Sequence, residues 1–380
     1  MMLNVDPLQI EALRTLLERL EYDAVQRNLR PDYFTSPFPA ASTLERVLET
    51  LPPLQQTSYR CLFLGQPVAR EELDDRWGRA LTEGLLRLGL LEPAGSNIVR
   101  TADFSVVSFL DRYFVVSMSP YYPHARNSDT PVYIGPDSLT LVTALPYHGT
   151  FDRVLDLCTG SGIQAILLAD VAEQVTAVEL NQLAARAAHF NAVLNSVADR
   201  ITIAQGNLYD ALPNDRYDLI VANPPFLPVP ESAYHPVCGN GGEDGLAVIE
   251  PLLYGMPARL SDDGQGIVYG EGVGDDKGPF VRQLLASLAS EMQVEVKLIL
   301  LSRSSVRVAL YLKAMSLAQL PRLAAGGMRP WKQLYERLGA SHTYTYLIKM
   351  RKRDSGAGMS VLTALNLDRE VRLQEAVDGQ

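Results

Sequence analysis

The sequence is poor in the features that mark several classes of protein. Only three of its 380 residues are cysteines (Cys61, Cys158 and Cys238), and no two of them form a CxxC pair. This excludes a disulfide-rich scaffold and a zinc site of the usual spacing, so we expect a reducing compartment and no metal. No apolar run approaches the ~18 residues of a membrane helix. The first residues lack the basic start and apolar centre of a signal peptide. We expect a cytoplasmic protein with no membrane partner.

The chain also has fewer basic than acidic residues. The chain has 34 Lys and Arg against 44 Asp and Glu, a formal net charge of −10, and an isoelectric point near 5.1. Proteins that hold nucleic acid through its phosphates need a positive surface, so the composition disfavours DNA or RNA as a partner. The short basic run "KMRKR" at 349–353 keeps a local contact with RNA open, with a solvated edge as the alternative.

What is present is an ordinary globular composition, 47% hydrophobic and 21% charged, at a length that suggests two domains. Helical spacing of apolar residues begins at Ile10 and continues in patches to residue 91. The segment 72–101 has the pattern of a helix, a glycine and a short turn with β-like flanks. It resembles a winged-helix module, with a plain helical cap as the alternative. We predict a mainly helical, substrate-recognising domain over residues 1–115.

From about residue 138 the pattern changes to strands alternating with helices. The strands, such as "RVLDLC" and "DLIVAN", are apolar throughout, which is typical of a parallel sheet covered on both faces. The segment "TYTYLIKMRK" alternates as a late edge strand does. We predict an α/β, doubly wound domain over 116–353, followed by a C-terminal tail, 354–380, that is partly disordered or a short helix. Ligands of such a sheet bind beyond the carboxyl ends of its strands.

Polar residues and glycines stand at three of these strand ends. Asp156 ends the first strand, and Gly160 and Gly162 follow in a tight turn, where glycine lets backbone N–H groups approach a ligand. Glu179 ends the second strand, where an acid accepts hydrogen bonds from a ribose diol. Asn207 follows the third strand, where its side chain either bonds the edge of a purine or forms an Asx turn. The missing third glycine and the charge of Asp156 disfavour a pyrophosphate, which makes a nicotinamide dehydrogenase the weakest rival.

The fourth strand ends in "NPPF". The Asn223 side-chain oxygen and the Pro224 carbonyl are two acceptors a few ångströms apart, held stiffly by the Pro224–Pro225 pair. They match the two hydrogens of a planar –NH2 group, and Phe226 offers a ring to stack on it. Such a pocket aligns a nitrogen for in-line displacement. The alternative is a cis-proline turn.

In this order and spacing, "DLCTGSG", "VEL", "GNL" and "NPPF" resemble class I S-adenosylmethionine-dependent methyltransferases, most closely the glutamine N5-methyltransferases of release factors and ribosomal proteins. The resemblance covers about residues 130–300. It implies a Rossmann-like, seven-stranded, mostly parallel sheet, S-adenosyl-L-methionine as cofactor, and methylation of a planar amide or amino nitrogen in a protein or small molecule. The cofactor-binding residues that it implies are Asp156, Cys158, Thr159, Gly160, Gly162, Glu179, Leu180, Asn207, Leu208 and Asn223, and the catalytic ones Asn223, Pro224, Pro225 and Phe226.

The sequence departs from the family pattern at two positions. Cys158 replaces a glycine, which puts the approach of the backbone to the cofactor in doubt, and Asn207 replaces a more usual aspartate. Methylation of adenine N6 or guanine N2 in nucleic acid, and a non-catalytic binding module, are the alternative functions. Tyr121, Tyr122 and Tyr133 are candidates for the wall of the substrate pocket or for loop packing.

Overall fold

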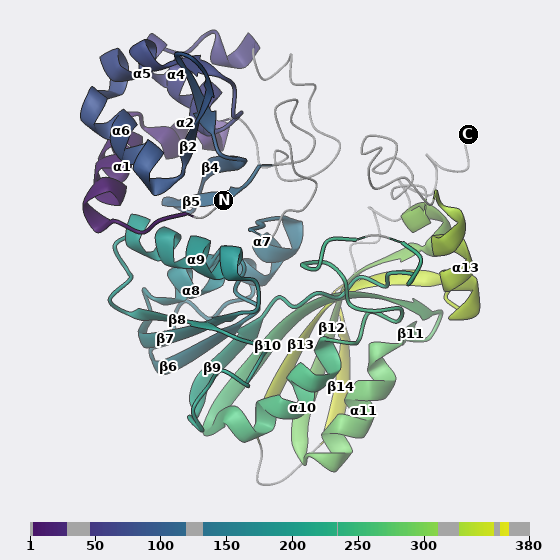
Figure 1. Ribbon diagram of the computed structural model, residues 1–380. Helices are drawn as coiled ribbons and strands as arrows, with labels where there is room; N and C mark the ends of the chain where they lie inside the picture. Colours follow the sequence, from purple (N-terminus) through teal and green to yellow (C-terminus); the bar gives the residue numbers. More distant parts are fainter. Residues whose placement is uncertain are drawn as a thin grey trace.

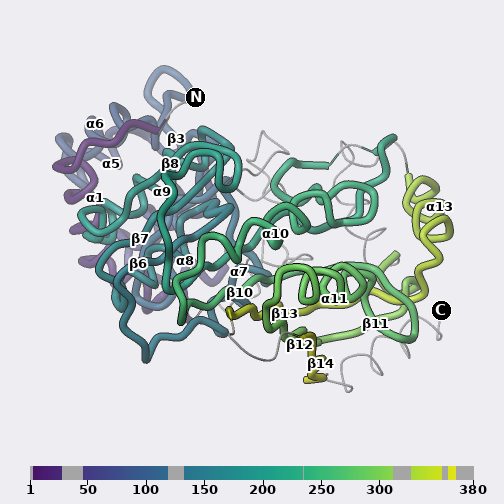
Figure 2. Tube along the Cα trace, turned by 90° about the horizontal axis from the view of Figure 1, so that it is seen from below, coloured from purple at the N-terminus to yellow at the C-terminus, as the bar shows by residue number. Residues whose placement is uncertain are grey.

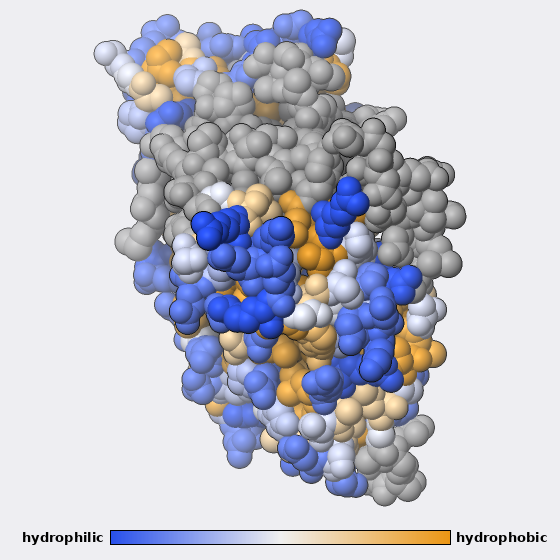
Figure 3. All heavy atoms as spheres, turned by 90° about the vertical axis from the view of Figure 1, so that its right-hand side faces the viewer, coloured by the Kyte–Doolittle hydropathy of each residue, from blue (hydrophilic) through white to orange (hydrophobic). Residues whose placement is uncertain are grey.

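The structure is a computed structural model that describes residues 3–28, 46–118, 132–233, 235–310, 327–352 and 358–364. An amino-terminal unit of helices and small sheets lies against a large sheet with helices on both of its faces (Figure 1). In these ranges no helix is long and apolar enough to cross a membrane. On the side that carries helix α13, Figure 3 shows hydrophilic and hydrophobic residues intermingled.

The large sheet has the predicted α/β, mostly parallel organisation. Its strands run in the order β14-β12-β13-β10-β9-β6-β7-β8, and β11 pairs with β10. Only β13 is antiparallel to both of its neighbours in this order. The strands are β6 (Phe151–Leu157), β7 (Ala172–Glu179), β8 (Ile201–Gln205), β9 (Tyr217–Ala222), β10 (Leu260–Asp275), β11 (Gly278–Pro279), β12 (Val294–Ser305), β13 (His342–Lys352) and β14 (Gly358–Thr363).

Two expectations about the end of the chain are wrong. The segment "TYTYLIKMRK" forms β13, which lies inside the sheet between β10 and β12 rather than at its edge. Residues 358–363, expected in a disordered or helical tail, form β14, which pairs parallel with β12 and is the edge strand. With β11 and β14, the sheet has nine strands among the described residues instead of the predicted seven.

Helices cover both faces of this sheet. The face toward the amino-terminal unit carries α7 (Pro136–Thr143), α8 (Ile163–Leu168) and α9 (Gln182–Leu194) (Figure 1). The opposite face carries α10 (Ile249–Arg259) and α11 (Val281–Glu291), which lie side by side in Figure 2. Helix α13 (Arg329–Arg337) precedes β13. The doubly wound arrangement therefore leaves the carboxyl ends of β6, β7, β8 and β9 along one edge.

The amino-terminal unit contains three helices around a small antiparallel sheet, and its identity as the expected winged-helix-like module stays a prediction. Its elements follow the order helix, strand, helix, helix, strand, strand, and β3 pairs antiparallel with both β1 and β2. Helix α1 (Pro7–Arg19) packs against α6 of this module. Asp6 caps α1 by accepting from the backbone N–H groups of Leu8 and Gln9. The remaining elements are α2 (Tyr22–Asn28), α4 (Pro53–Leu62), β1 (Val68–Ala69), α5 (Arg70–Trp77), α6 (Arg79–Leu88), β2 (Leu91–Gly95) and β3 (Ile98–Thr101).

A hairpin of β4 (Phe104–Phe109) and β5 (Arg112–Ser117) joins this unit to the large domain. Among the described residues no strand pairs with the outer edge of β5, and asparagine side chains of α9 bond its backbone instead. Asn191 accepts from the Val115 N–H at 2.7 Å and donates to the Val115 carbonyl at 3.1 Å. Asn195 does the same for Tyr113, at 2.9 and 2.7 Å. The predicted domain boundary, between residues 115 and 116, falls inside this strand.

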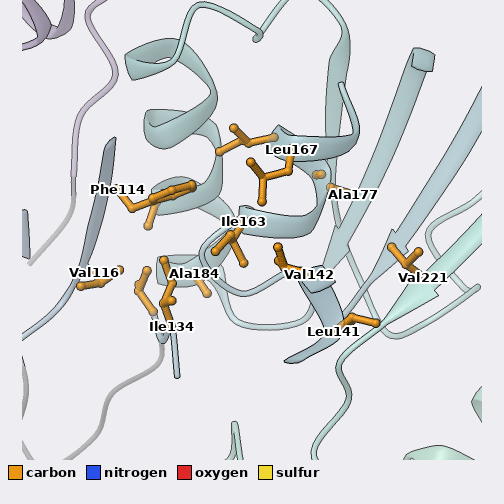
Figure 4. Close-up of a cluster of buried hydrophobic side chains, with 14 of the residues drawn as sticks. Phe114, Val116, Ile134, Leu141, Val142, Ile163, Leu167, Ala177, Ala184 and Val221 are labelled. Carbon is orange, nitrogen blue, oxygen red and sulfur yellow. The ribbon is translucent and has the colours of Figure 1, made fainter. Parts of the chain in front are cut away.

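The interface behind the hairpin is part of the hydrophobic core. Phe114 and Val116 of β5 face the cluster that holds Ile163 of α8 and Ala184 of α9 (Figure 4). These side chains belong to one contiguous set of buried apolar residues that runs from α1 to β13. Burial of this kind contributes roughly 25 cal/mol per Å² of apolar surface, so the hairpin is held mainly by packing and oriented by the asparagines.

Candidate active site

The structure brings the first, second and fourth predicted strand ends together. Strand β6 lies between β7 and β9, and Leu157 of β6 is opposite Val178 of β7 and Ala222 of β9. Asp156, Glu179 and Asn223 therefore end adjacent strands at the same edge of the sheet. Strand β8 continues this edge beyond β7, where Gln205 pairs with Glu179 two residues before Asn207.

The turn after β6 keeps the backbone conformation that glycine favours. Cys158 has a φ of 59°, and Gly160 and Gly162 have φ of 57° and 82°. Cys158 thus adopts a left-handed backbone conformation, which a residue with a side chain rarely takes. A left-handed residue with a Cβ costs about 1–2 kcal/mol. Burial raises the pKa of the Cys158 thiol, so the thiol stays neutral at physiological pH.

Asp156 is a buried carboxyl that organises this turn. Its Oδ2 accepts from the Thr159 hydroxyl at 2.5 Å and from the Ala165 N–H at 3.2 Å. Its Oδ1 is buried and has no partner among the described residues. Burial raises the pKa of Asp156 to about 7. The side chain therefore holds the turn, and its second oxygen is the part left for a ligand.

Glu179 closes the turn from the second strand. Its Oε2 accepts from the Gly160 N–H and its Oε1 from the Asn181 N–H, each at 2.8 Å. Burial raises the pKa of this carboxyl. Two carboxylate oxygens fixed by backbone amides form a preorganised acceptor pair for a vicinal diol. A Cβ at Gly160 would have no atom nearer than the Cys158 carbonyl oxygen at 4.0 Å, so the turn is open there. These residues fit a nucleoside with a free ribose diol.

Three other residues predicted to contact the cofactor are exposed or partly exposed. Leu180 is 57% exposed directly after Glu179. Asn207 is exposed, and its carbonyl oxygen accepts from the Asp210 N–H at 3.0 Å in a tight turn. Leu208, with a φ of 46°, is partly buried against the core. The expected contacts of these residues with the cofactor stay predictions.

At the fourth strand end, Asn223 is held by a residue that the sequence did not single out. Its Nδ2 donates to Asp137 Oδ2 at 2.7 Å and to Ser138 Oγ at 3.4 Å, across 86 and 85 positions of the chain. Its Oδ1 is buried and has no partner in the described part of the chain. The only sequence signal for Asp137 is its place in the first turn of α7, directly after Pro136.

The other residues of "NPPF" form a rigid loop. Phe226 is 8% exposed, and its ring packs edge-on against Tyr269, with centroids 5.4 Å apart. The glycine-rich stretch 239–245 pairs with the backbone after Phe226, where the Leu227 N–H donates to the Gly239 carbonyl at 3.0 Å. A Cβ at Gly245 would lie 2.5 Å from the Phe226 carbonyl oxygen, so only glycine permits this approach. The loop after Pro224 and Pro225 is thereby fixed from outside.

Aromatic and acidic side chains surround this loop. The Tyr269 hydroxyl donates to Glu271 at 2.6 Å, at the carboxyl end of β10. Tyr133, which the sequence offers as a pocket wall, is 41% exposed. Its hydroxyl occupies the space beside Gly135, where a Cβ would lie 1.7 Å from it. Tyr121 and Tyr122 lie outside the described residues.

Sequence comparisons with known proteins match the part of the chain that contains these strand ends. Residues 133–235 match the family model described as "Methyltransferase small domain". The chain is 40% identical over 123 residues to a ribosomal protein uL3 glutamine methyltransferase of Bordetella pertussis, covering 30% of this chain and 41% of that one. It is 35% identical to a release factor glutamine methyltransferase of Rhodopirellula baltica, covering 30% and 43%.

The name of a third relative gives a small molecule as its substrate. The 4-amino-L-phenylalanine/4-methylamino-L-phenylalanine methyltransferase of Streptomyces pristinaespiralis is 38% identical over 129 residues, covering 30% of this chain and 43% of that one. Each of these three alignments spans less than half of the relative. What is shared is thus the domain around the strand ends.

Proposed function

We propose that this protein methylates a planar amide or amino nitrogen. The premise is that residues 133–235 are a domain of the class I S-adenosylmethionine-dependent methyltransferase family. The observation that carries the proposal is the Asn223 side chain. Its Oδ1 is buried without a partner among the described residues, and its Nδ2 is fixed by Asp137. A buried acceptor without a donor costs about 1–3 kcal/mol, which a bound –NH2 group would recover.

The chain supplies binding and orientation. Glu179 would hold the ribose diol of S-adenosyl-L-methionine, and the turn from Asp156 to Gly162 would lie along its amino-acid portion. When bound, this cofactor supplies an electrophilic methyl group on a positively charged sulfur. Asn223 Oδ1 and the Pro224 carbonyl would accept the two hydrogens of the target nitrogen, so that its lone pair points along one line. As the nitrogen takes the methyl group and the bond from that group to sulfur breaks, the nitrogen would release a proton to water, so no strong base is needed beside it.

The relatives favour a protein acceptor. Two of the three named above are glutamine methyltransferases of a ribosomal protein or a release factor, and the third acts on the amino group of an aminophenylalanine. Glutamine and 4-amino-L-phenylalanine each carry an –NH2 group on a planar carbon, which matches two acceptors in one plane, whereas 4-methylamino-L-phenylalanine has one N–H and would fill one of them. We propose a glutamine side chain of a protein as the first candidate acceptor and a small aromatic amine as the second.

Transfer of a labelled methyl group tests the proposal. The protein is incubated with methyl-labelled S-adenosylmethionine and, separately, ribosomal protein uL3, a release factor, 4-amino-L-phenylalanine and cell extract. Label in one of these pools is expected with the wild type. Asn223→Ala is expected to abolish transfer while the affinity for the cofactor, measured by calorimetry, changes by less than about threefold. Asn97→Ala, at the exposed turn between β2 and β3, is the matched control. No cofactor binding by the wild type would indicate a non-catalytic module.

Nucleic acid is the alternative acceptor, and the charges of the chain count against it. Arginines of the winged-helix-like module are paired with its acids, as in Arg76–Glu72 at 3.1 Å and Arg79–Glu83 at 2.9 Å. In the basic run, the Lys352 ammonium donates to the Leu260 carbonyl at 2.6 Å. Label that appears in RNA or DNA of the extract would favour this alternative.

A further inference from the structure

The orientation of Asn223 depends on one carboxyl group. An asparagine amide can face a neighbour with either its NH2 group or its oxygen, and the two differ by a flip of the side chain. An ionised carboxylate only accepts hydrogen bonds, so it selects the NH2 group. Asp137 Oδ2 lies 2.7 Å from Asn223 Nδ2. The Asn223 oxygen must then point away from Asp137, which is where it is buried without a partner among the described residues.

Asp137 is itself fixed by the start of α7. Pro136 and Asp137 are in the first turn of this eight-residue helix, and the Gly135 N–H donates to Ser138 Oγ at 3.4 Å. Burial raises the pKa of the Asp137 carboxyl group, and hydrogen bonding with the Asn223 side chain, the backbone at Ser138 and Asp137 and the Tyr133 side chain opposes this rise. Gly135 leaves the space that the Tyr133 hydroxyl occupies. The carboxylate therefore faces Asn223 with little freedom to turn.

We propose that Asp137 is a positioning residue that selects the amide orientation of Asn223 and so presents the Asn223 oxygen to the target nitrogen. This rests on the proposed function for its effect on turnover, although the orientation itself exists in the protein without any acceptor. The same contact explains why the start of α7 and the end of β9, 86 residues apart, are joined.

The group that titrates in this arrangement is Asp137. Burial raises its pKa, while the hydrogen bonds from Asn223, Ser138 and Tyr133 oppose the rise. Burial raises the pKa of Tyr133 on the same loop and of Tyr269 on β10, so both phenols are neutral at physiological pH; the charges of Asp137 and of Glu271 act on both of them. When Asp137 is protonated it becomes a donor and no longer selects the NH2 group. Turnover is therefore expected to fall as pH falls through the raised pKa of Asp137.

The direct test is nuclear magnetic resonance of protein labelled with ¹⁵N in asparagine side chains. In the wild type the Asn223 NH2 resonances, assigned through Asn223→Ala, are expected to shift with the titration of a carboxyl group. Asp137→Asn, which keeps the shape and removes the charge, is expected to abolish this titration. Resonances that titrate identically in Asp137→Asn would overturn the inference. This readout needs no methyl acceptor, so it stands apart from a failure of the proposed function.

The kinetic test uses the acceptor found in the labelling experiment. Asp137→Asn is expected to lower kcat by up to about 100-fold, because a small misplacement of a group that aligns the reacting atoms can cost that much. The affinity for the cofactor should stay within about threefold, and the acidic limb of the pH profile should disappear. Asp75→Asn, an exposed acid on α5, is the control. An unchanged kcat and an unchanged acidic limb would overturn the positioning role.

Discussion

Asn191→Ala tests how the hairpin and the cofactor turn are connected. The Asn191 side chain is fully buried and makes hydrogen bonds to the Val115 N–H, the Val115 carbonyl and, at 2.9 Å, the Ser161 carbonyl. Each buried hydrogen bond contributes about 1 kcal/mol net, and a buried group left unpaired costs about 1–3 kcal/mol. We expect Asn191→Ala to lower the free energy of unfolding by about 3 kcal/mol or more.

The position of Ser161 makes a second effect measurable. Ser161 lies between Gly160 and Gly162, so loss of its bond from Asn191 frees the turn that we assign to the cofactor. Hydrogen exchange is expected to speed up in peptides covering 113–117 and 159–162, and the affinity for S-adenosylmethionine is expected to fall. Denaturant unfolding and calorimetric titration measure the two losses.

Asn195→Ala is the matched control. Asn195 makes the same pair of bonds to Tyr113 but has no bond to the cofactor turn. It should therefore lower stability while leaving cofactor affinity unchanged. The reasoning is refuted if Asn191→Ala costs less than about 1 kcal/mol, or if both variants weaken cofactor binding equally.

Three further changes follow from the site. Glu179→Gln is expected to weaken cofactor binding, measured by calorimetry, by about tenfold or more. The glutamine side chain has a single oxygen and cannot accept hydrogen bonds from the backbone N–H groups of both Gly160 and Asn181. An unchanged affinity would exclude Glu179 from the cofactor site. Asp156 has a pKa raised from 3.8 to about 7, so the folded protein keeps a proton that the unfolded chain releases. Wild-type stability should fall relative to Asp156→Asn as pH rises from about 4 to about 7, by at most about 4 kcal/mol; a melting-temperature difference that is flat with pH would contradict this. Cys158→Gly is expected to retain stability, since relief of the left-handed backbone offsets the lost side chain; denaturant unfolding that shows a loss above about 1 kcal/mol would count against that account.

The parts of the site that the sequence reveals are local. A glycine turn, an acid at a strand end and a proline pair can each be recognised within a few residues of sequence. The parallel topology then brings them to the same edge of the sheet. Asp137 and Asn191 act through partners 86 and 76 positions away, and no local pattern marks such pairs. Strand β13 was expected at an edge because its residues alternate, but an interior antiparallel strand alternates as well when its two faces differ in burial.

Helix α9 has a consequence for any attempt to isolate a minimal catalytic fragment. The stretch shared with the relatives' family model begins at residue 133, after the hairpin, yet α9 within that stretch also packs against α1. A fragment that begins at residue 133 would expose the apolar side chains that pack against the hairpin and α1. It would also leave Asn191 and Asn195 without the backbone groups of β5 to which they bond. The family match therefore begins at residue 133, whereas we expect a fragment that folds on its own to begin earlier in the chain.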